Sequence, residues 1–399
     1  MSFCVGENEW VILTLPDGCK RLAQTGRGAL IDFGRFGKFQ ADSLIGKQYG
    51  TYWKVLPDGQ LCPTSPPSQG APVEEITATN QTLSDTNTSQ RLTTQDIEEL
   101  KAQVSSGNIT AEQVVQTLIE GSETFSGKNA YSQIKYVQRK QRKFSRWFIL
   151  QEVTPRTLSA YFMSKDPRKI MDLRLDVLSQ IICLSNIGAT GSRTLVWDET
   201  NGFLTSCLLT RMTPTSLLVH VHPDRQMQAQ SLMYFNFSSF QRSRLIPWPI
   251  ASFFDCEDLI EEDEEKVKWK EPDPERRAIQ MRRKEEKQAR KQLVTNLITN
   301  SRFDALIIAT NRHEPLEILQ KVSSALRPSA KIIIYSSWRE LLLPSYVALR
   351  KDSTYLDVFG SETWMRPYQA APGRIHPHMT CNGHSGLILS ATRIGNSTL

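Results

Sequence analysis

The stretch LVWDETNGFLTS at residues 195–206 has the order of a cofactor-binding turn: an apolar run, a polar turn with a glycine, and the start of an apolar helix. Such a turn brings the backbone and the first helical N–H groups close to a nucleotide-like ligand. Small residues allow that approach, and Gly202 is the one glycine in the turn. Glu199 and Asn201 precede it and bulky Phe203 follows it, so side chains are expected where the ligand should lie.

Two further positions that a cofactor site needs are also poor. The strand after the turn should end near an acid that binds ribose hydroxyls, but SLLVHVHPDR offers His220 there. The strand in FDALIIATNRHEP should deliver a polar or acidic catalytic residue at its carboxyl end, and it delivers Ala309, Thr310 and Asn311. Because all three positions lack the residue types that a cofactor site needs, the sequence favours a cofactor pocket that no longer functions.

The segment KYVQRKQRKFSRWF, residues 135–148, is the densest basic stretch of the chain and contains no acid. It is either a solvated helix face whose aromatic residues turn toward a core, or a surface that contacts RNA phosphates while an aromatic ring stacks on a base. The missing acids favour RNA contact. The expected contact residues are Lys135, Arg139, Lys140, Arg142, Lys143 and Arg146.

A second cluster, HPHMTCNGH at residues 376–384, contains three of the six histidines and Cys381. Imidazole and thiol groups so close could bind zinc, but Pro377 stiffens the segment and no second cluster supports it. We expect a loop beside the former pocket, at an interface with a partner or with RNA. His220 and His222 share one face of a strand and are expected to be structural.

Two arginines lie near that cluster, in a stretch that also contains tryptophan and tyrosine. Arg366 and Arg374 are close in sequence to Trp364 and Tyr368. Arginine binds phosphate in a fork and stacks on bases, but the same residues would also suit contacts between subunits. The sequence leaves both roles open.

Apolar strand-like runs alternate with helical patterns from about residue 170, through TLVWDE, SLLVHV, FDALIIAT and KIIIYSS to SGLILSATRI. Such alternation predicts a mostly parallel sheet covered by helices. We therefore predict an α/β, Rossmann-like domain at 165–399. A charged insertion at 255–292, expected to be solvated or mobile, interrupts it.

The N-terminal part has a different pattern, of β-rich runs and tight turns. EWVILTLPDG and YWKVLPDGQL each lead a β-rich run into a Pro-Asp-Gly turn, which predicts hairpins, and the glycines between them suit a small β-barrel at 1–62. Residues 63–92 are rich in Pro, Ser, Thr and Asn and are expected to be a disordered linker. Residues 93–164 are expected to form a helical and basic connecting segment, with Thr110 capping one helix.

The whole chain has 399 residues and a net charge of +6, and its seven cysteines form no CxxC pair. Dispersed cysteines favour reduced thiols. No apolar run approaches the roughly 18 residues needed to span a membrane, and the N-terminus does not look like a secretory signal. No GxSxG nucleophile motif occurs.

In order and content these motifs resemble the non-catalytic subunits of eukaryotic tRNA (adenine-58-N1)-methyltransferases. The resemblance rests on KYVQRKQRKF, on LVWDETNGFLTSCLL, on FDALIIATNRHEP, and most specifically on SETWMRPYQAAPGRIHPHMTCNGHSGLILSATRI at 361–394. It implies a class I methyltransferase fold whose cofactor turn falls on Glu199 to Phe203, whose ribose-binding acid falls near His220, and whose catalytic aspartate falls near Ala309. None of these functional residues is retained.

The resemblance also implies partners and a place in the cell. A homologous catalytic subunit would bind S-adenosylmethionine, this chain would bind no cofactor, and two copies of each would form a nuclear heterotetramer that methylates tRNA to m1A. We expect tRNA contacts from the basic segment and from Arg366 and Arg374. Two alternatives remain: an active S-adenosylmethionine-dependent RNA methyltransferase with a divergent loop, and an RNA-binding protein unrelated to modification.

Overall fold

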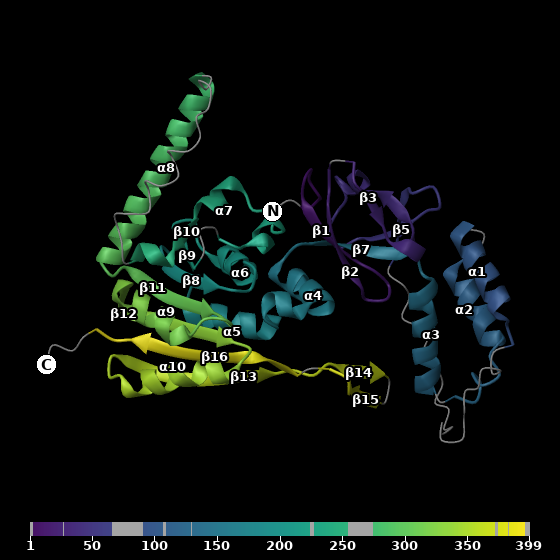
Figure 1. Cartoon of the computed structure of the whole chain (residues 1–399). Coiled ribbons are helices and arrows are strands. Elements are labelled where there is room, and N and C mark those ends of the chain that lie inside the picture. The colour runs from purple at the N-terminus through teal and green to yellow at the C-terminus, as the bar shows by residue number, and fades with distance from the viewer. Residues whose placement is uncertain are drawn as a thin grey trace. The chain divides into compact units, whose positions relative to one another are not determined.

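The computed structural model (Figure 1) describes residues 3–26, 28–65, 91–106, 109–128, 130–223, 227–253, 274–371, 374–381 and 383–395. These residues belong to two compact units. The first comprises residues 1–153 with 366–381, and the second comprises residues 154–365 with 382–399. Most of the expected linker, and the acidic half of the expected insertion, lie outside the described residues.

The first unit is built on a five-stranded antiparallel sheet with the order β2-β1-β7-β5-β6. Phe148 and Leu150 of β7 are buried in its core beside Val11 and Leu13. The strands are β1 (Trp10–Thr14), β2 (Lys20–Gln24), β5 (Tyr52–Val55), β6 (Leu61–Thr64) and β7 (Trp147–Glu152), and a separate pair comprises β3 (Leu30–Asp32) and β4 (Lys38–Gln40).

Both expected Pro-Asp-Gly hairpins are present, β1–β2 and β5–β6. In the first, Gly18 has a φ of 85° and donates its N–H to the carbonyl of Leu15 at 2.9 Å. The sheet differs from the domain expected at 1–62, because its central strand β7 comes from the segment expected to be a connector. Closure into a barrel stays a prediction.

In the described part of the chain, three α-helices precede β7: α1 (Thr94–Ser106), α2 (Ala111–Glu120) and α3 (Ala130–Phe144). Thr110 caps α2 as expected, in a capping box with Gln113. Phe144 of α3 is buried against Val114 and Leu118 of α2. One face of α3 is therefore fixed against α2, and its other face is left to solvent.

The second unit contains a seven-stranded sheet with the order β10-β9-β8-β11-β12-β16-β13. The first five of these strands pair in parallel, and β16 runs antiparallel between β12 and β13. The strands are β8 (Arg193–Asp198), β9 (Leu217–His222), β10 (Leu245–Pro249), β11 (Phe303–Ala309), β12 (Leu326–Ser336), β13 (Tyr355–Trp364) and β16 (His384–Arg393). The sheet confirms the Rossmann-like fold.

The helices of this unit follow the strands as expected, and α5 and α10 both pack on β12 and β16. Pro274 begins a 26-residue helix in the charged insertion. The helices are α4 (Pro155–Lys165), α5 (Leu175–Ser185), α6 (Phe203–Arg211), α7 (Ser239–Ser243), α8 (Pro274–Thr299), α9 (Pro315–Val322) and α10 (Arg339–Lys351). Across the described ranges, no helix combines the length and apolar character that membrane crossing requires.

Candidate functional site

Ligands of doubly wound sheets bind outside the carboxyl ends of the strands, at the point where the strand order reverses. Here the order reverses between β8 and β11, whose last residues Asp198 and Ala309 are paired in register. The turn that was expected to bind a cofactor leaves β8 at this point. The geometry of residues 199–202 therefore decides what the site can hold.

The side chain of Glu199 occupies the reversal point. Its carboxylate lies among donors from β8 and from the segment after β11, and only 13% of the side chain is exposed. Oε1 accepts hydrogen bonds from Trp197 Nε1 at 3.2 Å, Thr310 Oγ1 at 2.8 Å and His313 Nδ1 at 2.5 Å, and Oε2 accepts them from the backbone N–H groups of Asn311 at 2.9 Å and Arg312 at 3.0 Å.

These donors also set the charge of the carboxylate. Burial alone would raise the pKa of Glu199, but the hydrogen bonds from His313, Asn311, Thr310 and Trp197 outweigh it and hold the pKa below its ordinary value of 4.5. Glu199 is therefore ionised at neutral pH. The five donors that surround the carboxylate are thereby satisfied within the chain.

A second buried carboxylate, Asp198, organises the start of α6. Its Oδ1 accepts from the backbone N–H of Thr200 at 2.7 Å, and its Oδ2 accepts from the N–H and the hydroxyl of Thr205 at 2.8 and 2.7 Å. The Thr205 hydroxyl in turn lies 3.1 Å from Nδ1 of His220. Burial lowers the pKa of His220 to about 4, so this imidazole is a neutral part of the core.

Gly202 is required by a contact with the protein itself. Its φ is 77°, and a Cβ there would lie 2.6 Å from the Cα of Ala229. Asn201, with a φ of 57°, accepts a hydrogen bond at its carbonyl from the N–H of Ser231 at 3.1 Å. The segment around the short helix η5 (Gln230–Met233) thus packs on the turn where a ligand would approach.

Phe203 does not lie where the sequence suggested. Its side chain is fully buried and meets the ring of Phe162 edge-on, with ring centroids 6.0 Å apart. The expectation that Phe203 stands in the pocket is wrong, because the first turn of α6 directs it into the core. Ala309 is also buried, and its carbonyl accepts from the N–H of Glu199 at 3.0 Å.

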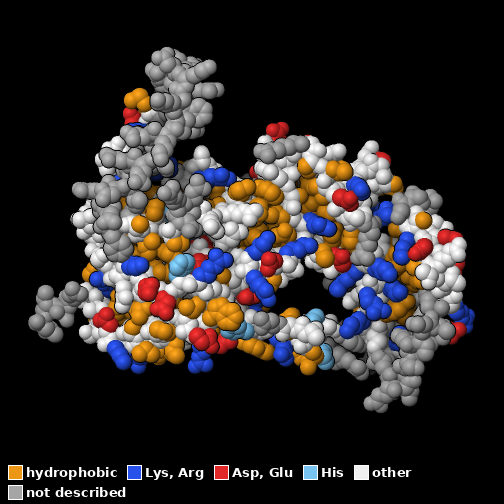
Figure 2. Space-filling view, in the orientation of Figure 1, with side chains coloured by type: hydrophobic (Ala, Val, Ile, Leu, Met, Phe, Trp, Pro, Cys, Tyr) orange, Lys and Arg blue, Asp and Glu red, His pale blue; other side chains and the backbone are white. Residues whose placement is uncertain are grey.

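The basic helix α3 exposes its charges on one face. Four cations recur at helical intervals of three and four residues, so they lie together, and Figure 2 shows Lys and Arg side chains gathered over α3. In the part of the chain that the structure describes, none of the four has an ion-pair partner. They are Lys135, Arg139, Arg142 and Lys143, all exposed.

The other two predicted cations lie differently. Lys140 is half-buried, and its Nζ lies 5.1 Å from the ring centroid of Tyr136, which Lys128 and Arg139 also approach at 5.6 and 5.9 Å. Arg146 follows the end of α3 and is half-buried at the start of β7. The exposed basic face of α3, named here the α3 face, is therefore Lys135, Arg139, Arg142 and Lys143.

The two arginines near the C-terminus lie in the segment around β14 (Tyr368–Ala371) and β15 (Arg374–Pro377). Arg366 is half-buried between β13 and β14. The backbone of Arg374 begins β15, and its side chain lies outside what the structure describes. Trp364 lies close to Gly383, whose Cβ position would fall 2.4 Å from the indole Nε1.

The clustered histidines have separate partners. His384 Nδ1 lies 2.7 Å from a carboxylate oxygen of Glu362, and Nδ1 of His376 lies 2.7 Å from the carbonyl of Pro377. Cys381 donates to the carbonyl of His378 at 3.2 Å. Within the described ranges, no group of three or more His, Cys, Asp or Glu side chains is placed to hold a metal ion.

Sequence reasoning missed the residues that fill the site. The sequence suggested no role for Thr310 or His313, whereas they hold Glu199. Asn311 was treated in the same way, and its Oδ1 accepts from Ser336 and Ser337 at the end of β12. The available signal was an acid directly after one strand and the polar run TNRH directly after another.

Comparisons with known proteins agree with this geometry. The chain is 25% identical over 418 residues to tRNA (adenine(58)-N(1))-methyltransferase non-catalytic subunit TRM6 of Debaryomyces hansenii, which covers 98% of this chain and 86% of that protein. It is 27% identical over 437 residues to the subunit trm6 of Schizosaccharomyces pombe, with 98% and 92% covered. These relatives match the chain along nearly its whole length.

A solved structure and a family model complete the comparison. The S-adenosylmethionine-dependent O-methyltransferase of Thermotoga maritima superposes with a TM-score of 0.51 at 11% identity, covering 98% of this chain and 96% of that one. This likeness shows a shared fold. The sequence model of the Gcd10p family matches residues 4–289, which is more than half of the chain. The chain therefore belongs to the Gcd10p family.

Proposed function

We propose that this chain is the non-catalytic, tRNA-binding subunit of a methyltransferase that modifies N1 of adenine 58 in the T-loop of tRNA. Its relatives are named as non-catalytic subunits of tRNA (adenine(58)-N(1))-methyltransferases. The observation that carries the proposal is the Glu199 carboxylate at the reversal point of the sheet, held by five donors. A homologous catalytic subunit would supply the chemistry.

The residues of this site do not fit S-adenosylmethionine. The cofactor's ribose hydroxyls need an acceptor near the end of β9, where His220 is buried and already hydrogen-bonded to Thr205. Its backbone approach needs a free glycine turn, whereas Gly202 packs on Ala229. No step of the reaction is therefore assigned to this chain, and the cofactor belongs to the partner.

Binding of tRNA is proposed to use the α3 face. Its four exposed cations can neutralise RNA phosphates and release counterions, and such contacts make affinity fall with salt. Lys140 and Tyr136 adjoin this face, and Arg146 follows it in sequence. Arg366 and Arg374 are proposed as further RNA contacts from the C-terminal hairpin. A nuclear assembly with two copies of each subunit completes the proposal.

A calorimetric titration tests the cofactor assignment. Purified chain is titrated with S-adenosylmethionine, alone and then co-expressed with the catalytic subunit. We expect heat of binding with the complex and none with the chain alone. Saturable binding by the chain alone would instead support an active methyltransferase with a divergent loop.

Measurement of the salt dependence of tRNA affinity tests the α3 face. In the complex, replacing its four cations with alanine is expected to lower the slope of log K against log salt by about 3, since each phosphate contact contributes about 0.7–0.9. The matched control replaces four cations of α8, where Glu285 and Glu286 are interspersed: Arg282, Lys284, Arg290 and Lys291. An unchanged slope in the α3 variant would remove α3 from the RNA-binding surface.

A further inference from the structure

Three cavities lie side by side on the second unit and share Glu340. The smallest, about 160 Å³, lies between the start of α9 and α10. The others, about 710 and 600 Å³, follow two sides of α10. We name this surface the α10 face; it comprises Glu314 at the start of α9 with Trp338, Glu340, Leu343, Tyr346 and Val347.

The centre of the α10 face is apolar although it is open to solvent. Leu343 and Val347 follow each other at the spacing of one helical turn, and they are 52% and 42% exposed. Trp338 and Tyr346 flank them at 58% and 36%. A contiguous apolar patch on a helix surface is typical of a protein-binding site.

The smallest cavity of this face is lined by two carboxylates and by no cation, whereas Arg339 and Lys351 line the two larger cavities. Neither carboxylate, Glu314 nor Glu340, has a partner among the residues that the structure describes. Pro344 lies inside α10 and has no N–H to donate to the Glu340 carbonyl one turn earlier. The surface therefore presents acceptors that need a donor from outside.

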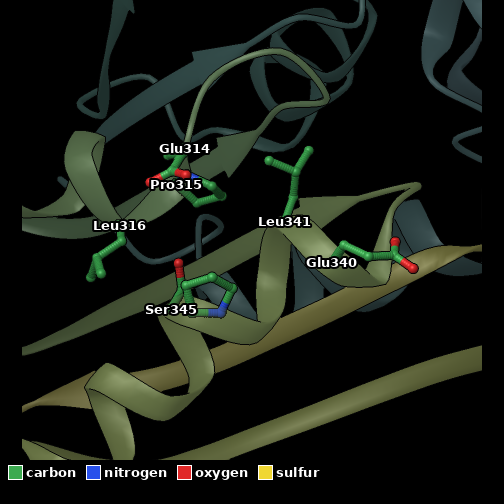
Figure 3. A pocket seen from close by; sticks show the side chains of 7 residues that line it. Glu314, Pro315, Leu316, Glu340, Leu341 and Ser345 are labelled. Carbon is green, nitrogen blue, oxygen red and sulfur yellow. The ribbon is translucent and has the colours of Figure 1, made fainter.

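The smallest cavity adds a buried polar atom. The Ser345 side chain is 0% exposed, and its Oγ has no hydrogen-bond partner among the described residues. Figure 3 shows this hydroxyl pointing toward Pro315 across the cavity. A buried hydroxyl left unpaired is costly, so an incoming donor that reaches the cavity would be stabilised there.

These features specify the chemistry of an occupant. Acceptors around an apolar centre match a segment that carries a lysine or arginine between apolar side chains. RNA is the poorer occupant of the smallest cavity, because its phosphates would face two unpaired carboxylates and no cation there. We propose that the α10 face docks the catalytic subunit through such a segment, with its cation near Glu314 and Glu340. This inference rests on the proposed function, which supplies the partner.

The test uses the full chain co-expressed with a tagged catalytic subunit. Two variants are compared with wild type, Glu340→Lys and Leu343→Asp, and the charge-matched control is Glu317→Lys on α9, which lines none of the three cavities. We expect each α10 variant to raise the Kd of the complex at least about tenfold, as loss of a central interface contact does. The control is expected to assemble as wild type does. The melting temperature of each isolated chain checks folding.

The outcomes separate the two proposals. Wild-type assembly with loss in both α10 variants, at unchanged melting temperatures, supports docking on the α10 face. If both variants assemble with the catalytic subunit as fully as wild type does, docking on the α10 face is overturned and the proposed function stays intact. Failure of the wild-type chain to assemble contradicts the proposed function itself. Weakened binding of tRNA by the isolated variants, with assembly retained, would assign the face to RNA instead.

Discussion

Replacing Glu199 with alanine is expected to destabilise the second unit more than any exposed glutamate does. The change removes one carboxylate and leaves five donors without their acceptor. His313, at 44% exposure, can turn to water, and the N–H of Arg312 lies at the exposed end of the turn. Trp197 and Thr310 are buried, and with Asn311 they bear most of the loss.

The magnitude follows from these three donors. A buried donor left unpaired costs about 1–3 kcal/mol, and donors that share one acceptor do not add fully. We therefore expect Glu199→Ala to lower the free energy of unfolding by about 3–5 kcal/mol. At about 2–4 °C per kcal/mol for a unit of this size, the melting temperature should fall by roughly 10 °C.

Urea unfolding followed by tryptophan fluorescence measures this loss, with Glu317→Ala as the exposed control. The pH dependence gives an independent check. Because the folded pKa of Glu199 lies below its ordinary value of 4.5, its stabilisation is present above pH 4.5 and is lost as the pH falls through the folded pKa. The variant should lack this acid-sensitive part. A loss below about 1 kcal/mol, with an unchanged pH profile, would refute the structural role of Glu199.

Three further predictions concern neighbouring features. Gly202→Ala should destabilise the chain by about 2 kcal/mol more than Gly191→Ala. Both glycines have positive φ, but only at Gly202 would the added Cβ meet Ala229. Urea unfolding gives the free energy of unfolding of each variant. His220 should stay neutral until the pH approaches 4, which NMR titration of the imidazole measures. The stability that the neutral imidazole gives the folded chain is present above about pH 6.5 and is lost as the pH falls toward 4. Titration of His220 near pH 6.5 would contradict its burial. Tyr136→Leu should weaken tRNA binding several-fold without changing the salt slope, measured by filter binding.

The parts of the fold that sequence predicted are those set by local patterns. The hairpins followed from the Pro-Asp-Gly turns, the α2 cap from Thr110, and the strands of the second unit from apolar runs such as FDALIIAT. The strand β10 was not expected, because LIPWP contains two prolines, and prolines suit only the edge of a sheet. β13 was missed because YLDVFGSETW does not alternate cleanly.

What local patterns could not supply is contact between distant segments. β7 pairs with β1 across more than 130 residues, and no property of WFILQE alone selects that neighbour. Composition predicted that the cofactor turn no longer functions, and this stays a prediction; composition did not reveal which contacts occupy the site. The obstruction was attributed to the side chains of the turn, with Glu199 and Phe203 among them. Glu199 does fill the site, using donors that lie more than 100 residues further along the chain, whereas Phe203 turns into the core.

The Glu199 carboxylate at the end of β8 also bears on whether folding of the chain depends on a ligand. A protein that binds a small molecule only when folded gains stability from it by mass action, so its abundance follows the supply of that molecule. Glu199 is part of the polypeptide, and its effective concentration is fixed by the chain itself. If the chain binds no methyl donor, as proposed, the folding of this unit is expected to be independent of the methyl-donor level in the cell.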